Sequence, residues 1–289
     1  HNRQDYNVSV YGGTTIEPAD PNLYNIDYDP HPLSHSTYVF ECGKVITESD
    51  SNSEFRLVRN LECYGEDAII FRGSDTIDNV TIDCDGRSIT GDGTHSAIKY
   101  VGSGSSDEEF KDSTIKNCII SNFSKGIEFK AHAYTYASCR VDGCAPRKRR
   151  EQQPHDNYIE DNEISNCDYG IWFSSDEDIS EISGSCVWSC DDACTDANVY
   201  SNTLIGNELT SNNIAVYFTN LPDDNSGDCS SDEENAHVEN NIIHTNIITN
   251  NSIGVKLTRE QAEAQYPQTN YFYNNLFNNT NNADASTGS

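Results

Sequence analysis

The segment N-C-D-Y-G-I-W-F, residues 166–173, has a close counterpart in N-F-S-K-G-I-E-F, residues 122–129. Each begins with Asn, continues through three variable residues and ends in Gly-Ile-x-Phe. A block that recurs within one chain is the signature of a repeat architecture. The other features of the chain are therefore best located relative to this block.

Further copies appear when the Gly of Gly-Ile-x-Phe is taken as a reference position. The position is occupied by Gly126, Gly170, Ala215, Gly254 and, by extension, Ala283. Apolar residues stand eleven positions earlier (Ile115, Ile159, Leu204, Ile243, Phe272) and six positions earlier (Ile120, Ile164, Leu209, Ile248, Phe277). Asn predominates eight positions earlier (Cys118, Asn162, Asn207, Asn246, Asn275) and four positions earlier (Asn122, Asn166, Ser211, Asn250, Asn279). Two earlier blocks, A-I-I-F at Ala68 and A-I-K-Y at Ala97, match only the final strand.

Gly-Ile-x-Phe predicts a short β-strand, because its apolar residues alternate with a period of two. The middle residue of each strand then points outward, and these residues are Glu128, Trp172, Tyr217 and Lys256. Asn and Gly at fixed offsets predict turns, since both tolerate a left-handed backbone. A unit of about two dozen residues buries its apolar face only by stacking on its neighbours. Equivalent Asn residues would then form amide ladders.

The pattern I-x-x-N-x-I-x-N-x-x-x-G-I-x-F resembles the right-handed parallel β-helix repeat family, which includes pectate lyases, polygalacturonases and many surface proteins. The segments D-N-V-T-I-D-C-D-G-R-S-I-T-G, residues 78–91, and S-T-I-K-N-C-I-I-S-N-F-S-K-G-I, residues 113–127, look like the opening coils of β-helix regions in archaeal cell-surface proteins. The resemblance covers residues 40–282 and implies an all-β, right-handed parallel β-helix solenoid. It implies no particular activity, because enzymes and scaffolds share this fold.

The repeat pattern divides the chain into three parts. Residues 1–38 lack it and are expected to form an extended N-terminal arm, residues 39–282 carry the parallel β-helix, and residues 283–289 are expected to form a flexible C-terminal tail. Three long insertions, residues 130–158, 174–203 and 219–242, leave successive coils at the same corner. We therefore expect one disulfide-rich lateral lobe, and such insertions commonly build the binding face of a solenoid.

The chain is strongly acidic. Its 47 acidic and 18 basic residues give a formal net charge of -29, which excludes nucleic acid as an expected partner and predicts self-repulsion at low salt. A solvated surface, as in halophilic proteins, and a divalent-cation site for calcium are the two interpretations of this charge, and no other cofactor is expected. No run of about 18 apolar residues predicts a membrane span. The start at His1, without Met or a leader, indicates a processed mature form.

Eleven cysteines indicate export to an extracellular or cell-surface location, because disulfides persist outside the reducing cytoplasm. The pairs expected in the early coils are Cys42 with Cys63 and Cys84 with Cys118. Six more cysteines fall in the insertions: Cys139, Cys144, Cys186, Cys190, Cys194 and Cys229. Disulfides are favoured over a metal site there, since no His lies at suitable spacing within the C-x3-C-x3-C run. The odd number leaves one thiol free or intermolecular, and Cys167 is the candidate.

Two further sets of residues point to the outside of the molecule. Five N-x-S/T sequons are candidate glycosylation sites: Asn7, Asn79, Asn122, Asn250 and Asn278. A basic cluster stands out in the first insertion and comprises Arg140, Arg147, Lys148, Arg149 and Arg150. A solvated charge run is its ordinary interpretation. The alternative is an interface for an acidic neighbouring copy or an anionic glycan.

Three functions fit these observations. The favoured one is an extracellular structural or surface protein that self-associates, as a filament subunit, through its end coils, N-terminal arm and basic cluster, because open solenoid ends expose unpaired backbone. The second is a polysaccharide-acting lyase or glycosidase, with Glu163, Glu208 and Asp161 as catalytic candidates from adjacent coils. The third is a module that binds surface glycans by stacking them on Trp172 and Tyr217. Catalysis is the less expected reading, because polygalacturonase-like signatures are absent as contiguous motifs.

Overall fold

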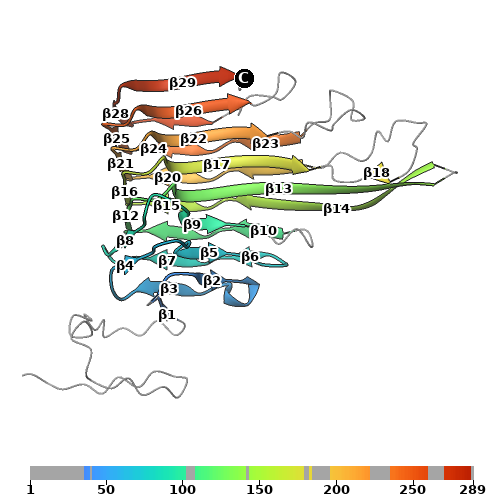
Figure 1. Ribbon diagram of the computed structural model, residues 1–289, viewed down its shortest axis with the longest axis horizontal. Coiled ribbons are helices and arrows are strands. Elements are labelled where there is room, and N and C mark those ends of the chain that lie inside the picture. The colour runs from blue at the N-terminus through green and yellow to red at the C-terminus, as the bar shows by residue number, and fades with distance from the viewer. Residues whose placement is uncertain are drawn as a thin grey trace, which may run out of the picture. The chain divides into compact units, whose positions relative to one another are not determined.

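The computed structural model describes residues 36–39, 41–101, 108–140, 143–178, 182–183, 196–221, 235–259 and 270–287, with the backbone alone in parts of the longest strands. From residue 36 onward, short strands wind into a right-handed parallel β-helix (Figure 1). The one helical turn in the described ranges is η2, Glu48–Asp50. The fold class is therefore the all-β solenoid that the repeat predicts.

Three rows of strands line the solenoid. Sheet A contains, in spatial order, β1 (Ser36–Val39), β3 (Glu54–Leu57), β7 (Thr81–Asp83), β11 (Thr114–Lys116), β15 (Tyr158–Glu160), β20 (Thr203–Ile205), β24 (Ile242–His244) and β27 (Tyr271–Tyr273). Sheet B contains β2 (Lys44–Ile46), β5 (Ile69–Phe71), β9 (Ser96–Tyr100), β13 (Lys125–Arg140), β17 (Tyr169–Asp178), β22 (Ile214–Leu221), β26 (Ile253–Arg259) and β29 (Asn281–Thr287). Sheet C contains β4 (Leu61–Glu62), β8 (Ser88–Thr90), β12 (Ile119–Ser121), β16 (Glu163–Ser165), β21 (Glu208–Thr210), β25 (Ile247–Thr249) and β28 (Leu276–Asn278).

A fourth row of strands follows sheet B along the chain. Row D contains β6 (Ile77–Asp78), β10 (Glu108–Lys111), β14 (Gly143–His155), β19 (Asp196–Tyr200) and β23 (Asn235–Glu239). Strands β13 and β14 form a long antiparallel hairpin that joins row D to sheet B and occupies most of the first insertion. The short strand β18 (Ile182–Ser183) pairs with β13. Whether the three insertions form one lobe stays a prediction, because much of the second and third lies outside the described residues.

The core consists of the apolar columns that the repeat predicts. Residues eleven positions before the reference are register partners in sheet A, and those six positions before it are partners in sheet C. The Phe column of sheet B continues the core, with ring centroids 5.6 Å apart for Phe129 and Phe173. The sequence alignment matched the early coils only at the strand of sheet B. In the structure, the apolar columns of sheets A and C also extend into them, because Ile82 pairs with Ile115 and Ile89 with Ile120.

Buried Asn residues form amide ladders at the corners. Between sheets A and C, Asn162 Nδ2 donates to Asn207 Oδ1 at 3.0 Å, and Asn207 Nδ2 donates to Asn246 Oδ1 at 2.9 Å. This is the column eight positions before the reference, as predicted. A ladder that the alignment did not show precedes sheet A and comprises Asn157, Asn202, Asn241 and Asn270.

The prediction of a ladder four positions before the reference is wrong. Asn122, Asn166, Ser211 and Asn250 are exposed turn residues with φ between 54° and 60°. Their left-handed backbone turns each side chain outward, so the buried ladder begins one residue later and comprises Cys167, Asn212, Asn251 and Asn279. Two consecutive residues therefore have different roles: the first forms the turn, and the second forms the hydrogen bonds of the ladder.

The two ends of the solenoid extend beyond the predicted boundaries. Strand β1 begins at Ser36, inside the expected arm, and the expected tail forms β29 as far as Thr287. Val255 pairs with Ala283, so the last coil is one residue shorter than an alignment on Ala283 assumes. The small reference residue is explained by close contact between coils, since a Cβ added at Gly170 would lie 2.6 Å from the carbonyl oxygen of Ala215.

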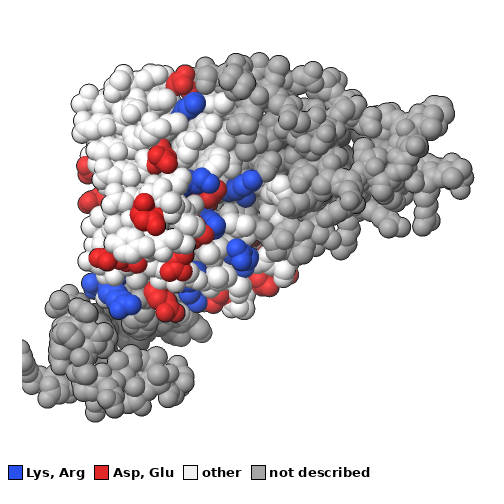
Figure 2. Space-filling model, in the orientation of Figure 1, with Lys and Arg blue, Asp and Glu red and all other residues white. Residues whose placement is uncertain are grey.

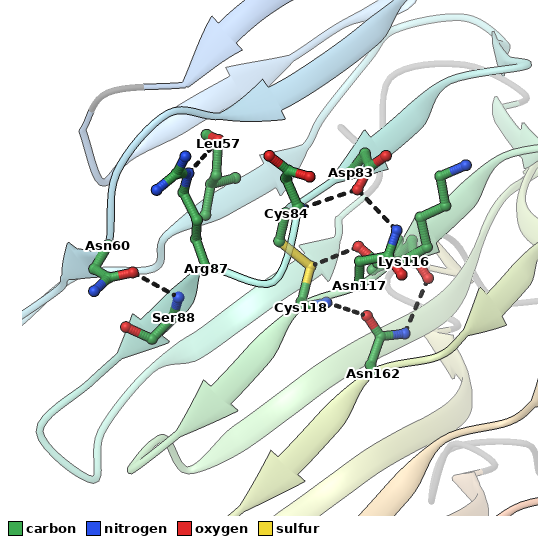
Figure 3. Close-up of a disulfide and its surroundings, with 12 residues drawn as sticks. Leu57, Asn60, Asp83, Cys84, Arg87, Ser88, Lys116, Asn117, Cys118 and Asn162 are labelled. Atoms are coloured by element: carbon green, nitrogen blue, oxygen red, sulfur yellow. Dashed lines mark hydrogen bonds between the residues drawn. A yellow bond between two sulfur atoms is a disulfide. The ribbon is translucent and has the colours of Figure 1, made fainter. Parts of the chain in front are cut away.

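Two disulfides cross-link successive coils in the early part of the solenoid. Cys42 is bonded to Cys63 and Cys84 to Cys118, the two pairs named from the sequence. Figure 3 shows Cys118 at the start of the ladder between sheets A and C, where its N–H donates to Asn162 Oδ1 at 3.0 Å. Cys167 has the matching place in the ladder between sheets C and B, and its thiol is buried and outside any disulfide.

Candidate ligand pocket on the outer face of sheet B

A column of charged and aromatic side chains follows the outer face of sheet B. The register places Lys99 beside Glu128, then Trp172, Tyr217 and Lys256 on successive strands. The neighbouring positions Ile127 and Phe129 are buried in the core, so the residue between them faces away from it. The predicted outward residues therefore share one surface, and Lys99 extends it into an earlier coil.

The aromatic half of this column is a closed stack. The ring centroids of Tyr169 lie 5.4 Å from Trp172 and 5.3 Å from Tyr217, with interplanar angles of 25° and 14°. Lys125 Nζ lies 4.0 Å from the Trp172 ring, and Lys256 Nζ lies 5.4 Å from Tyr217. The ring faces are thus turned toward one another and toward ammonium groups, and Tyr217 is only 8% exposed, so little of its ring is open to a ligand. Sugar stacking on Trp172 and Tyr217 stays a prediction.

The charged half of the column opens into a pocket of about 400 Å³. Its lining combines the three cations Lys99, Lys125 and Lys130 with the two carboxylates Asp67 and Glu128. The volume falls in the range of roughly 300–1,000 Å³ that is usual for small-molecule sites. We call this cavity the sheet B pocket.

Ser96 ties the two carboxylates of the pocket together. Its backbone N–H donates to Asp67 Oδ1 at 2.8 Å, and its hydroxyl donates to Glu128 Oε2 at 2.6 Å. The second oxygen of each carboxylate meets a lysine: Lys99 Nζ lies 2.5 Å from Asp67 Oδ2, and Lys125 Nζ lies 2.7 Å from Glu128 Oε1. Both carboxylates are thereby held in place by groups from two strands, β9 and β13.

Gln152 contributes a buried donor to the same lining. It lies on β14 opposite Glu108 and is 2% exposed. Its Nε2 has no hydrogen-bond acceptor among the residues that the structure describes. A buried amide without a partner costs about 1–3 kcal/mol, so an acceptor on a bound ligand would recover free energy at this point. Ser124, His95 and His132 complete the polar part of the wall.

The local charge of the pocket differs from that of the chain. Its lining carries three lysines against two carboxylates, whereas the whole chain has a formal net charge of -29. On the face shown in Figure 2, basic side chains lie interspersed with acidic ones over the middle and lower coils. The lining of the pocket is therefore less acidic than the composition of the chain as a whole.

The predicted catalytic carboxylates lie on a different sheet. Glu163 and Glu208 are register partners on β16 and β21 of sheet C, and both are exposed. Asp161 is an exposed turn residue with φ of 53°. The two glutamates are neighbours, as the repeat predicts, but none of the three lines the sheet B pocket. Their catalytic role stays a prediction.

Several predicted residues fall beyond the described side chains. Arg140, Arg147, Lys148, Arg149 and Arg150 lie on β13 and β14, where only the backbone is described, and the same holds for the register partners Cys139 and Cys144. Cys186, Cys190, Cys194, Cys229 and Asn7 lie outside the described residues. The other sequon residues, Asn79, Asn122, Asn250 and Asn278, are all exposed.

The described residues offer no metal centre. Within those ranges no group of three or more His, Cys, Asp or Glu is placed to hold a metal ion. Burial raises the pKa of the Cys167 thiol to about 11, so this residue is protonated at neutral pH and is a poor metal ligand. None of the helices in the described part of the chain could span a membrane.

The sequence alignment missed most of the pocket. Lys99 occupies the outward position of the A-I-K-Y block, so the repeat contained the signal that places it beside Glu128. Asp67 and Ser96 immediately precede the same two early blocks, and Lys125 precedes Gly126. Gln152 belongs to an insertion without a repeat, and no spacing in the sequence connects it to these residues.

One family model matches the chain. It is described as "Periplasmic copper-binding protein (NosD)" and covers residues 51–289. No curated protein and no solved structure matches the sequence.

Proposed function

The chain belongs to the NosD family, and we propose that it acts outside the cytoplasm as a β-helix that binds glycans in the sheet B pocket. The family description places its members in the periplasm, in keeping with the two disulfides of the early coils. The extracellular or surface location expected from the cysteines thus agrees with the family.

The observation that supports binding is the buried residue Gln152, which lines a pocket of about 400 Å³ and whose Nε2 has no acceptor among the described residues. The remaining lining supplies ammonium, hydroxyl and carboxylate groups within the same small volume. A sugar presents hydroxyl donors and oxygen acceptors around one compact ring, so it can satisfy both kinds of group at once. Lys125, which lines the pocket, also lies 4.0 Å from the Trp172 ring, so the aromatic stack begins next to the pocket wall.

The family description names copper, but the described residues do not form a copper-binding site. Copper sites use clustered imidazole, thiolate or thioether ligands. The chain contains no Met, and its described part has no cluster of three metal-binding side chains. His95 and His132 both line the pocket, but no third ligand of this kind groups with them there. We therefore assign no copper chemistry to the described residues.

The test of glycan binding uses a polysaccharide array that includes neutral and acidic chains. Ser124→Trp places a bulky ring in the pocket wall, and Ser121→Trp places the same ring on the outer face of sheet C. We expect the wild type and Ser121→Trp to bind the same glycan, and Ser124→Trp to bind it at least about tenfold more weakly. An array with no binder, or equal binding by the two variants, would show that the pocket has another role.

Self-association is our second proposal, and an exposed apolar patch on the last two coils favours it. Tyr271, Tyr273 and Leu276 are 51%, 48% and 60% exposed, and Ile247 pairs in register with Leu276. Exposed apolar clusters of this kind mark protein–protein contacts. The N-terminal arm and the basic cluster belong to the same proposal. Light scattering across a concentration series should show oligomers that Leu276→Glu weakens, and a monomer at every concentration would contradict it.

A further inference from the structure

We infer that a second copy of this chain docks on the last coil of the solenoid, where residues 9–16 of its N-terminal arm add one further coil. This inference rests on the proposed self-association and names the two segments that form the contact. It connects an open end in the structure, formed by β27 and β28, with a coil pattern in the sequence of the arm. Figure 1 shows β28 and β29 at one end of the stack of coils.

The last strands of sheets A and C each have an open edge. β27 pairs with β24 and β28 with β25, and no described strand pairs with their other sides. Tyr271 and Leu276 donate their N–H groups to carbonyl oxygens of the preceding coil, at 2.8 Å and 2.9 Å. Because backbone groups alternate in direction along a strand, those of the next residues, Phe272 and Phe277, face the open side. Such an edge is a template for an added strand.

Two Asn ladders end at the same place with unused donors. On either side of sheet A, a ladder Asn donates its N–H and its Nδ2 to the next coil, as Asn246 does to Asn275 Oδ1 at 2.9 Å and 3.0 Å. Asn270 and Asn275 end these ladders, and the corresponding donors have no acceptor among the described residues. The third ladder is closed, since Asn279 donates both groups to Asn282 Oδ1. Two acceptors, five positions apart, would complete the open ladders.

The apolar core is also incomplete at this end. Phe272 and Phe277 continue the columns of sheets A and C but are only partly buried, whereas Ile243 and Ile248, one coil earlier, are fully buried. An added coil would bury both rings if it carried apolar residues at the matching positions. The docking segment therefore needs two apolar residues five positions apart, each two positions after an acceptor.

One segment of the arm meets these requirements. It is S-V-Y-G-G-T-T-I, residues 9–16, which lies outside the described residues and is identified by its sequence. Ser9 and Thr14 fall at the two ladder positions, and Tyr11 and Ile16 fall at the two apolar positions. Gly13 falls at the corner between them, where the five coils from β11 to β27 all have φ between 53° and 68°. No Gly-Ile-x-Phe block follows the segment, so an alignment on that block does not detect it.

A hydroxyl can replace the amide of Asn as the acceptor in such a ladder, and the solenoid contains an example. Ser113 occupies the ladder position before sheet A, and its Oγ accepts a hydrogen bond from the backbone N–H of Val80 at 3.0 Å. Ser9 would accept from Asn270 in the same way, and Thr14 from Asn275. The segment thus supplies the acceptors that the last coil lacks.

The opposite end of the described solenoid offers no equivalent site. Its first strand in sheet A is β1, whereas sheet C begins with β4, one coil later. No described coil at that end therefore presents edge strands of sheets A and C at the same level. The inferred contact joins unlike surfaces of two copies, so it is heterologous and repeats from copy to copy unless a ring closes.

The first experiment measures docking of the segment itself. A fluorescent peptide of residues 7–19 is titrated into the full chain carrying Ile16→Asp, which keeps the last coil but has an altered arm. Anisotropy should show saturable binding, and a peptide with Ile16→Asp should bind at least about tenfold more weakly, because burial of one large apolar side chain contributes about that factor. With photoreactive benzoylphenylalanine in place of Tyr11, mass spectrometry should find the crosslink on residues 270–278.

Two glycine substitutions in the peptide test the register. The alignment places Gly13 at the left-handed corner and Gly12 at the position of Tyr273, where a side chain is tolerated. Gly13→Val should weaken binding about tenfold, since a β-branched residue is disfavoured in a left-handed backbone. Gly12→Val, the matched control, should bind as the unaltered peptide does. Equal effects of the two substitutions would overturn the inferred coil.

The full chain connects docking with self-association. Sedimentation velocity across a concentration series should show oligomers for the wild type and for Ile26→Asp, which makes the same change elsewhere in the arm, and a monomer for Ile16→Asp. Melting temperatures establish that each variant is folded. Ile16→Asp assembling like the wild type, a peptide that does not bind, or a crosslink elsewhere would overturn this inference and leave self-association intact. A wild type that is monomeric at every concentration would overturn the proposed self-association itself.

Discussion

Asn207→Ala is expected to be among the most damaging single substitutions in the solenoid. The Oδ1 of Asn207 accepts hydrogen bonds from the backbone N–H and the Nδ2 of Asn162, at 3.1 Å and 3.0 Å. Its Nδ2 donates to the carbonyl oxygen of Ile159 at 2.8 Å and to Asn246 Oδ1 at 2.9 Å. Asn207 is fully buried, so truncation removes four hydrogen bonds in an environment that excludes water.

The expected loss follows from the groups left without a partner. Asn246 Oδ1 keeps the backbone N–H of Asn207 at 2.9 Å, and Ile159 remains paired with β20, so two buried donors are orphaned: the N–H of Asn162 and one hydrogen of its Nδ2. Each buried orphan costs about 1–3 kcal/mol. A water molecule entering the vacated volume recovers part of this. We therefore expect the free energy of unfolding to fall by about 3–5 kcal/mol.

Asn166→Ala is the matched control, because it makes the same chemical change at an exposed corner. Asn166 has φ of 54°, and within the described part of the chain its side chain donates one hydrogen bond, to Ser165 Oγ at 3.5 Å. Its replacement should cost about 1 kcal/mol, which is the preference of Asn over Ala for a left-handed backbone. Urea unfolding with the disulfides kept oxidised, followed by circular dichroism, measures both variants. If Asn207→Ala costs no more than Asn166→Ala, the ladder does not stabilise the solenoid as argued.

Three other predictions concern single positions. The Cys167 thiol, with its pKa raised to about 11 by burial, should resist iodoacetamide in the native protein at pH 8 and react on unfolding. Because the pKa of the folded thiol is raised above its ordinary value of 9.0, the stabilisation is complete below pH 9 and is lost as pH rises toward 11. The stability difference between wild type and Cys167→Ala should therefore shift by about 2–3 kcal/mol over that window, and rapid labelling at pH 8 would contradict the burial. Gly170→Ala should lower the melting temperature, because its Cβ would lie 2.6 Å from Ala215 O, whereas an unchanged melting temperature would mean that the coils can separate at this point. Any copper bound after loading, measured by elemental mass spectrometry, should be unchanged in Cys167→Ser, and its loss would make this buried thiol a ligand.

The fold could be predicted from the sequence, because the side chains that stack in the core are the same ones that recur at fixed spacing in the repeat. Ile115, Ile159 and Leu204 recur at one spacing and fill one column, so alignment alone reveals their register. The alignment was less precise at the corners. The alignment indicated that Asn166 and the equivalent residues of other coils form a ladder. Only the backbone geometry shows that each of these is an outward turn residue and that the buried ladder residue follows it. The exposed turn and the ladder share a preference for Asn for different physical reasons.

The candidate site was predicted only in part, since binding surfaces on a solenoid do not repeat. Trp172 and Tyr217 were correctly placed on the outer face, but their mutual stacking depends on Tyr169 and on lysines from other coils. Gln152 reaches the pocket through the β13–β14 hairpin, whose length and register no repeat specifies. A residue that acts once, from an insertion, leaves no periodic signal in the sequence.

The pocket and the ladders occupy different parts of the solenoid, and this separation has a physical reason. The Asn ladders extend from β15 onward, where equivalent residues repeat without interruption. The pocket draws on the coils of β5, β9 and β13, where the matching positions hold Cys84, Cys118 and Phe123 instead of Asn. An amide ladder requires the same residue in every coil, whereas a pocket requires a different residue in each. A disulfide fixes two coils to one another without imposing such repetition. The covalent bond between Cys84 and Cys118 therefore allows the coils of β9 and β13 to vary in sequence and still hold Lys99 and Glu128 in register.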